Sequence, residues 1–292
     1  MSLDPRALED KAKKTLQSAS GGFSFFSNKE DKYQNAADLY VQAANAYRLE
    51  RMSQQAGACF KAAAAIQRDK LNEPDDAANI MIDAFKVLRK EYPQEALECV
   101  RAAIDRYVQK GNFRRAASHM ENAAEMLEVE LNDRVQAIEL YDKAAHWYEE
   151  DGAKALANKL WLKEADLQAL EGNYYEAVKK FELVANSSLD NNLMKYSVKD
   201  YWLKAGLCTL ATKDLVSARR SLQTYTDKDP TFAGQRECQL LADLIEAIDA
   251  GNLEVFTDKL YAYDQMSRLD KWKTEILMRI KHQIEEADNE FA

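Results

Sequence analysis

The chain has 292 residues, of which 47 % are apolar and 30 % charged, a balance typical of a folded protein and not of a disordered one. Forty basic and 49 acidic side chains give a net charge of −9. This charge argues against a general nucleic-acid binder, because neutralising phosphates requires a basic surplus or a concentrated basic patch.

No stretch approaches the roughly twenty apolar residues that a bilayer span needs. The first residues contain no long apolar run and no cleavage site, so we expect no secretory signal. The four cysteines are far apart and form no CxxC pair, which predicts buried thiols of a reducing compartment; they are Cys59, Cys99, Cys208 and Cys238. We therefore expect a cytoplasmic protein.

The first predicted helix covers residues 4–17, where Leu8, Ala12 and Leu16 fall on one face. A Gly/Ser segment at about 18–28 breaks this pattern and is predicted to be a loop that contains three phenylalanines. Further helices are predicted at 32–50, 54–69, 75–91, 94–110, 114–131, 134–149, 153–171 and 174–188. Turn signals separate them, at Asn72-Glu73-Pro74, Gly111-Asn112, Asp151-Gly152 and Gly172-Asn173.

An alanine recurs about every twenty residues, near the start of each of these helices. The positions are Ala36, Ala56, Ala77, Ala96, Ala116, Ala137, Ala157 and Ala177. Two helices in succession make a hairpin with a period near forty residues, and one hairpin cannot bury its apolar stripe alone. The sequence therefore predicts an all-α, tetratricopeptide-like array of antiparallel helical hairpins that forms a twisted sheet over residues 1–192.

The regular spacing of alanines and helices changes near residue 190. Helices are predicted at 195–211, 215–226, 232–250, 253–266 and 270–287. We interpret residues 193–292 as a C-terminal helical bundle that caps the array. The first of these helix pairs is also compatible with a last repeat, so the boundary is open.

Catalytic motifs are missing. There is no phosphate-binding glycine loop, no HExxH and no GxSxG. The histidines, His119, His146 and His282, lie on different predicted helices. We expect no enzyme activity, no cofactor and no metal site.

Three surfaces are candidates for binding. The first is formed by Phe23, Phe25 and Phe26, which either fold back on the first hairpin or enter a membrane interface. Burial of each ring in a membrane would supply about 1.5–3 kcal/mol, so that binding would be reversible.

The second candidate surface is basic. Two arginines open one helix, two lysines four residues apart share one face of another, and two lysines follow the array; these are Arg114, Arg115, Lys159, Lys163, Lys199 and Lys204. They are either scattered solvated charges or a stripe that orients an acidic helical partner.

The third candidate surface is acidic. Glu285, Glu286, Asp288 and Glu290 lie close to Phe291 near the end of the sequence. Glu246 and Asp249 lie earlier in the same predicted bundle. These acids are either a solubilising tail or a docking surface.

Several segments resemble the alpha-SNAP family, the soluble NSF attachment proteins of vesicle fusion, and the fungal members most of all. They are Lys195–Cys208 (KYSVKDYWLKAGLC), Arg236–Cys238, Ser267–Lys273, Ala157–Lys159 and the phenylalanine segment. The resemblance covers essentially the full length. It implies a twisted sheet of helical hairpins with a C-terminal bundle. It also implies that several copies coat an assembled SNARE four-helix bundle and recruit NSF, a hexameric AAA ATPase that takes the bundle apart.

The resemblance also assigns residues. Lys159 and Lys163 match family SNARE contacts, whereas a further basic position of the family is Ser118 here, and Arg114 and Arg115 lie one turn away. The ATPase-facing acids of the family map onto Asp214, Glu246, Asp249, Asp288 and Glu290. Phe291 stands where the family has a leucine that stimulates ATP hydrolysis. We expect a protein peripherally associated with membranes.

The alternative reading is a tetratricopeptide-type co-chaperone that binds peptides in its groove. Such clamps need Lys, Asn and Arg side chains converging on one carboxylate. The basic residues here are spread over several hairpins.

Overall fold

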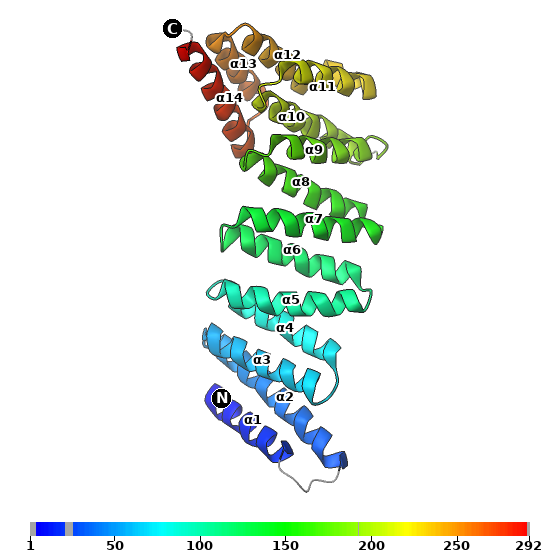
Figure 1. Ribbon diagram of the computed structural model, residues 1–292, viewed down its shortest axis with the longest axis vertical. Helices are drawn as coiled ribbons and strands as arrows, with labels where there is room; N and C mark the ends of the chain where they lie inside the picture. Colours follow the sequence, from blue (N-terminus) through cyan, green and yellow to red (C-terminus); the bar gives the residue numbers. More distant parts are fainter. Residues whose placement is uncertain (1–3, 21–25, 192, 291–292) are drawn as a thin grey trace. The chain divides into compact units, whose positions relative to one another are not determined.

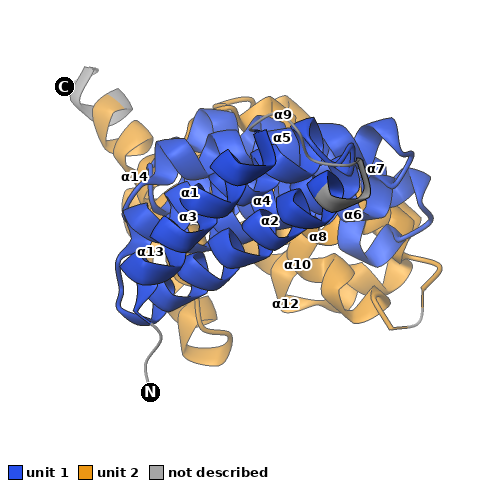
Figure 2. Cartoon of the chain, turned by 90° about the horizontal axis from the view of Figure 1, so that it is seen from below, with its two compact units in different colours: residues 1–157 blue, residues 158–292 orange. Residues whose placement is uncertain are grey.

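The computed structural model describes residues 4–20, 26–191 and 193–290, and this part of the chain is helical with no strand in it (Figure 1). It divides into two compact units, residues 1–157 and 158–292 (Figure 2). The predicted all-α class is confirmed. The units divide within a helix, whereas the predicted end of the repeats lies at residue 192; where the repeats end stays a prediction.

Unit 1 is a row of antiparallel helices, each packed against the next one along the chain (Figure 1). The helices are α1 (Pro5–Ser20), α2 (Phe26–Leu49), α3 (Ser53–Asp69), α4 (Pro74–Leu88), α5 (Pro93–Gln109), α6 (Phe113–Val129) and α7 (Arg134–Glu150). Contact between sequence neighbours is the defining property of a helical repeat array. The predicted hairpin repeats are therefore confirmed in this unit.

Buried alanines hold these helices together. All eight alanines of the repeat are at most 6 % exposed, the seven from Ala36 to Ala157 in unit 1 and Ala177 in unit 2. A methyl side chain lets two backbones approach closely, and large rings such as Tyr107 and Tyr141 fill the remaining space between helices.

The predicted turns are confirmed at the helix ends. Gly111 and Gly152 have φ angles of 71° and 77°, a left-handed conformation that glycine adopts without steric cost. The next helix then begins with a cap, since the Asn112 side chain accepts a hydrogen bond from the Arg115 amide at 3.4 Å. This cap fixes the start of α6, where both candidate arginines lie.

Unit 2 surrounds one central helix. It contains most of α8 (Lys154–Leu170), then α9 (Tyr174–Ser188), α10 (Lys195–Ala211), α11 (Leu215–Lys228), η1 (Pro230–Gly234), α12 (Arg236–Asp249), α13 (Leu253–Met266) and α14 (Lys271–Glu290). Helix α10 contacts α9, α11, α12 and α14. Its residues 202–211 are buried on nearly all sides, which explains why its apolar residues follow no single stripe.

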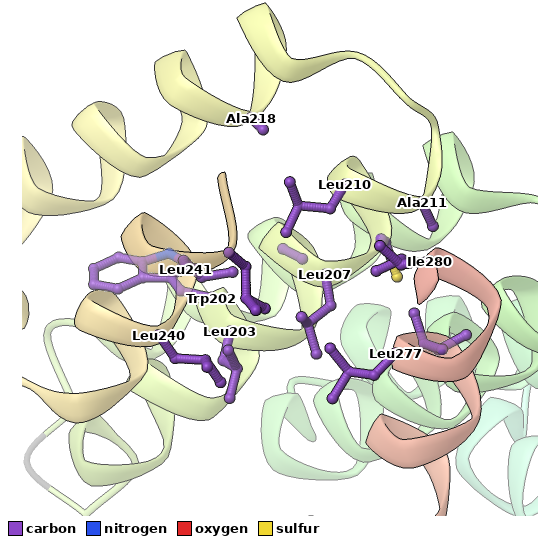
Figure 3. Packing of buried hydrophobic residues seen from close by; sticks show 14 of the residues in the cluster. Trp202, Leu203, Leu207, Leu210, Ala211, Ala218, Leu240, Leu241, Leu277 and Ile280 are labelled. Atoms are coloured by element: carbon purple, nitrogen blue, oxygen red, sulfur yellow. The ribbon is translucent and has the colours of Figure 1, made fainter. Parts of the chain in front are cut away.

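The core of unit 2 forms around α10 (Figure 3). Trp202 stacks on Tyr225 with ring centroids 5.4 Å apart and meets Phe232 edge-on at 5.1 Å. Leu203, the next residue, and Leu207, one turn after it, are fully buried. Leu277 and Ile280 of α14 pack into the same cluster, so α14 is part of this core.

Two segments differ from the sequence prediction. Helix α1 extends to Ser20 because the Ser18 and Ser20 hydroxyls donate to the carbonyls of Thr15 and Gln17, so these serines are satisfied inside the last turn. Helix α2 already begins at Phe26, which shortens the predicted loop. Phe23 and Phe25 lie outside the described residues.

The helix predicted at 232–250 is interrupted. Asp229 caps the short 3₁₀ turn η1 by accepting from the Thr231 amide at 3.0 Å. Gln235 is then extended, with φ −89° and ψ 149°, before α12 begins. The apolar pattern continues through this break because Phe232 is itself a core residue.

The four cysteines are buried and free, as predicted. Burial raises the pKa of the Cys59 thiol to about 12 and that of Cys99 to about 11. The thiolate, which is the reactive form, is therefore scarce at neutral pH.

The contact of Gly57 with α4 gives a test of the close packing in unit 1. A Cβ atom at Gly57 would lie 2.6 Å from Leu88 Cδ2 and 2.7 Å from its Cγ, and Leu88 is fully buried. Overpacking of this kind costs about 1–3 kcal/mol, and alanine regains about 1 kcal/mol of helix propensity. The difference centres on about 1 kcal/mol, so we expect Gly57→Ala to lower the free energy of unfolding by about this amount in urea denaturation.

Gln54→Ala, at an exposed position of the same helix, is the matched control and should change stability by less than about 0.5 kcal/mol. Equal stability of the two variants would mean that Leu88 has room to move.

Candidate partner-binding surfaces

The arginines of unit 1 lie in the first turn of α6 and differ in their surroundings. The Arg114 side chain is 65 % exposed and lies 3.5 Å from an Asp151 carboxylate oxygen. Arg115 is held more firmly, because its Nη2 donates to Asn79 Oδ1 at 2.8 Å and its guanidinium lies 4.5 Å from the centre of the Tyr107 ring. Ser118, four residues after Arg114, is half-buried on the same helix.

A small polar network fixes the direction of Arg115. The Tyr107 hydroxyl donates to the same Asn79 oxygen at 3.0 Å, and the Tyr107 ring stacks on His119 at 5.4 Å. Burial, and then the nearby Arg115 cation, lower the pKa of His119 to about 4. The imidazole is therefore neutral at pH 7 and adds no charge to this surface.

In unit 2, Lys159 and Lys163 lie on one side of α8. Lys159 is exposed and Lys163 half-buried, and a separation of four residues places them on the same face. The opposite side of the helix is fixed in the core. There, buried Glu164 pairs with Lys180 at 3.0 Å, and that ammonium lies 5.7 Å from the centre of the Trp161 ring.

The two lysines of α10 have different roles. Lys199 is 44 % exposed and pairs with the buried Glu237 at 3.1 Å. Lys204 is only 14 % exposed, donates to Asp166 Oδ1 at 2.8 Å and lies 4.8 Å from the centre of the Trp272 ring. Its charge is thus used inside unit 2, and contact of Lys204 with a partner stays a prediction without support from its position.

The acidic residues that the structure describes lie at helix ends of unit 2. Asp214 caps α11 by accepting from the Ser217 amide at 2.9 Å and from its hydroxyl at 2.6 Å. These hydrogen bonds hold the pKa of the Asp214 carboxyl below its usual value, which keeps it ionised. Asp249 accepts from Arg219 Nη2 at 2.7 Å, and Glu246 is exposed on α12.

The remaining predicted contacts can be located only in part. Asp288 and Glu290 belong to the last turn of α14, where the structure describes the backbone alone. Phe291 lies outside the described residues.

Sequence reasoning did not predict that Asn79 and Tyr107 fix Arg115, or that His119 stacks on Tyr107. They come from α4, α5 and α6, and only the forty-residue hairpin spacing relates them in sequence. Within the described part of the chain, no group of three His, Cys, Asp or Glu side chains could hold a metal ion, and no helix has the length and hydropathy of a bilayer span.

The fold and these surfaces define a class of protein: a helical-hairpin repeat protein with charged side chains held at its helix ends and faces. The family model "Soluble NSF attachment protein, SNAP" matches residues 3–285 of the chain. The chain therefore belongs to the soluble NSF attachment protein family.

Relatives are similar in sequence to this chain over nearly its whole length. A Neurospora crassa protein called "Probable vesicular-fusion protein sec17 homolog" is 61 % identical over 292 residues, 100 % of both chains. The Saccharomyces cerevisiae "Alpha-soluble NSF attachment protein" is 39 % identical, covering 98 % of this chain and 99 % of its own. The Homo sapiens protein of the same name is 36 % identical, covering 96 % and 94 %. The predicted resemblance to the family, and to its fungal members in particular, is confirmed.

The lowered pKa of His119 predicts a pH dependence. Because the folded state disfavours the imidazolium, the contribution of His119 to stability is full above its unfolded pKa of about 6.5 and is lost as the pH falls toward about 4. We expect His119→Phe, which keeps the ring stacked on Tyr107, to show a smaller loss of stability between these pH values in urea denaturation.

Proton NMR provides the direct check. The His119 titration should have its midpoint near pH 4 and should move up in Arg115→Gln, because removal of the nearby cation favours protonation. The spectrum of His119→Phe, in which this signal is absent, identifies the resonance. A His119 midpoint near 6.5 would contradict the assignment.

Proposed function

We propose that this protein binds assembled SNARE complexes and recruits and stimulates an NSF-type hexameric AAA ATPase, which disassembles and recycles them in vesicle-mediated membrane fusion. The observation that carries the proposal is the family match over residues 3–285. The names of the relatives, vesicular-fusion protein and NSF attachment protein, point to the same process. In this proposal the protein is an adaptor, and the ATPase performs the chemistry.

The proposed SNARE contact centres on Lys159 and Lys163. Their support is that both lie on the same face of α8, whose other face is fixed by Glu164 and the core. Cations on a rigid helix can steer and orient an acidic four-helix bundle without losing much side-chain entropy. Arg114, Arg115 and Lys199 are proposed as further SNARE contacts, and Arg115 in particular is held in one direction by Asn79.

The proposed ATPase contact is acidic and lies in unit 2. It comprises Asp214, Glu246, Asp249, Asp288, Glu290 and Phe291. Asp214 and Asp249 are held in place by Ser217 and Arg219, which supports a preorganised acidic surface for a basic domain of the ATPase.

The proposed membrane contact is the phenylalanine segment, Phe23, Phe25 and Phe26. Reversible insertion would concentrate the protein where SNARE complexes lie, which raises their effective affinity without any new SNARE contact. In this proposal the protein is cytoplasmic and peripherally associated with membranes, and several copies act on one SNARE complex.

One experiment tests the core of the proposal. The protein is sedimented with an assembled SNARE bundle and with the ATPase held in a non-hydrolysing nucleotide state. We expect a ternary complex with several copies of the protein, and no ATPase on the bundle when the protein is left out. Absence of the protein from the SNARE pellet would refute the proposal.

The basic surface is tested by charge reversal. Lys159→Glu with Lys163→Glu places two negative charges opposite an acidic bundle, so SNARE binding should weaken by about tenfold or more, about 1.4 kcal/mol. The loss should be larger at low salt, because screening reduces the interaction at high salt. Titration by fluorescence anisotropy at two salt concentrations measures both effects.

Lys179→Glu with Lys228→Glu makes the same change in net charge at exposed positions of α9 and α11 and serves as the control. Equal affinities for the two double variants would exclude the α8 lysines from the contact.

The phenylalanine segment is tested by comparing SNARE disassembly in solution with disassembly on liposomes. Replacing Phe23, Phe25 and Phe26 by serine removes about 1.5–3 kcal/mol of membrane burial per ring. Disassembly of soluble SNARE complexes should keep its rate, and disassembly on liposomes should slow. An equal loss in both assays would assign the rings to the fold of the first hairpin.

A further inference from the structure

Helix α14 is attached to the end of α8, more than one hundred residues earlier in the chain. The Trp272 indole Nε1 donates to the Asp166 carbonyl at 2.9 Å, across 106 residues. Two turns further along α14, Arg279 Nη1 donates to the carbonyls of Leu170 at 3.0 Å and Ala169 at 3.4 Å. These bonds join two helices that are not sequence neighbours.

The Arg279 side chain binds at the C-terminal end of α8, where a cation is stabilising. The last carbonyls of a helix have no partner within it and carry the negative end of the helix dipole. Helix α8 ends at Leu170, so the guanidinium of Arg279 satisfies the Leu170 carbonyl and complements the dipole. The Ala169 carbonyl accepts from the Gly172 amide at 3.0 Å as well as from Arg279. Glu275 Oε1 accepts from Arg279 Nε at 3.0 Å and holds the side chain in this direction.

A second layer of contacts secures the same junction. Asp166 accepts from Lys204 Nζ of α10, and that ammonium lies between the Trp272 ring and Phe181, at 4.8 Å and 5.6 Å from their centres. Trp272 also meets Phe181 edge-on at 5.6 Å. Helices α8, α9, α10 and α14 therefore meet at one largely buried junction.

The junction joins the helices that carry the two proposed contacts. In α8, Lys159 and Lys163 of the SNARE contact precede the junction in sequence; in α14, Asp288 and Glu290 of the ATPase contact follow it. Along the chain, α8 and α14 are connected only through α9 to α13 and their loops. A rigid junction shortens the path by which a load at the end of α14 reaches the helix that contacts the SNARE bundle.

We propose that Arg279 is a positioning residue that couples the ATPase-contact helix α14 to the SNARE-contact helix α8, so that work done on α14 is delivered to the bundle. This inference rests on the proposed function. It separates binding from coupling: removing the guanidinium should leave both partners bound and make the disassembly less efficient.

The test measures the number of ATP molecules hydrolysed per SNARE complex disassembled, with Arg279→Gln, at a temperature well below the melting temperature of the variant. SNARE binding, and ATPase recruitment without hydrolysis, should stay within about twofold of the unmodified protein, as for a site distant from both contacts. The ATP consumed per complex should rise at least about fivefold, the lower end of couplings between separate sites. Arg279→Lys, which keeps a cation at the end of α8, should restore part of the efficiency.

Lys281→Gln removes the same charge from the same helix two residues away and is the matched control, expected to behave as the unmodified protein. If Arg279→Gln fails to fold, Trp272→Phe removes the donor to Asp166 while retaining an aromatic ring, and the same rise is expected. An unchanged ATP cost in the folded variant overturns the coupling role. Failure of the unmodified protein to bind SNARE bundle or ATPase refutes the proposed function instead.

Discussion

Close contact between neighbouring helices through alanine is the constraint on which the array depends. Ala36 and its counterparts at later repeats are buried where helices cross, and Gly57 meets Leu88 where even a methyl group would not fit. Because each helix of unit 1 packs mainly against its neighbours along the chain, the rest of the unit compensates little for a loosened crossing. The packing at these crossings orients each helix, and it therefore also sets the positions of the charged side chains on the helix surface.

The charged surfaces differ in how firmly they are held. Arg115 is fixed by Asn79 and Tyr107, and Asp214 by Ser217, whereas Arg114 and Glu246 extend from the surface with more freedom. Fixed charges lose less entropy when a partner binds, and exposed ones contribute mainly to long-range attraction. Such a mixture suits the proposed adaptor function, in which partners are captured quickly and then released.

Local features of the sequence predicted most of the fold. The alanine spacing and the turns at Gly111 and Gly152 depend on residues close in the chain, so helices and hairpins follow from periodicity. The roles of single cations could not be predicted from periodicity. Lys204 binds Asp166 across 38 residues of sequence, and Arg115 binds Asn79 across 36. Lys204 in particular lies in the part of α10, residues 202–211, that is buried on nearly all sides, where no polar face predicts which charge is solvated.

The buried, protonated thiols have a practical consequence for spectroscopy. We expect Cys59 and Cys99 to react slowly with maleimides, since raised pKa values reduce the thiolate and burial limits access to it, and Cys208 and Cys238 are buried in the same way. A single cysteine introduced on an exposed helix face would be labelled selectively in the native sequence background. Fluorophore or spin-label pairs could then follow movements of individual helices during a reaction cycle.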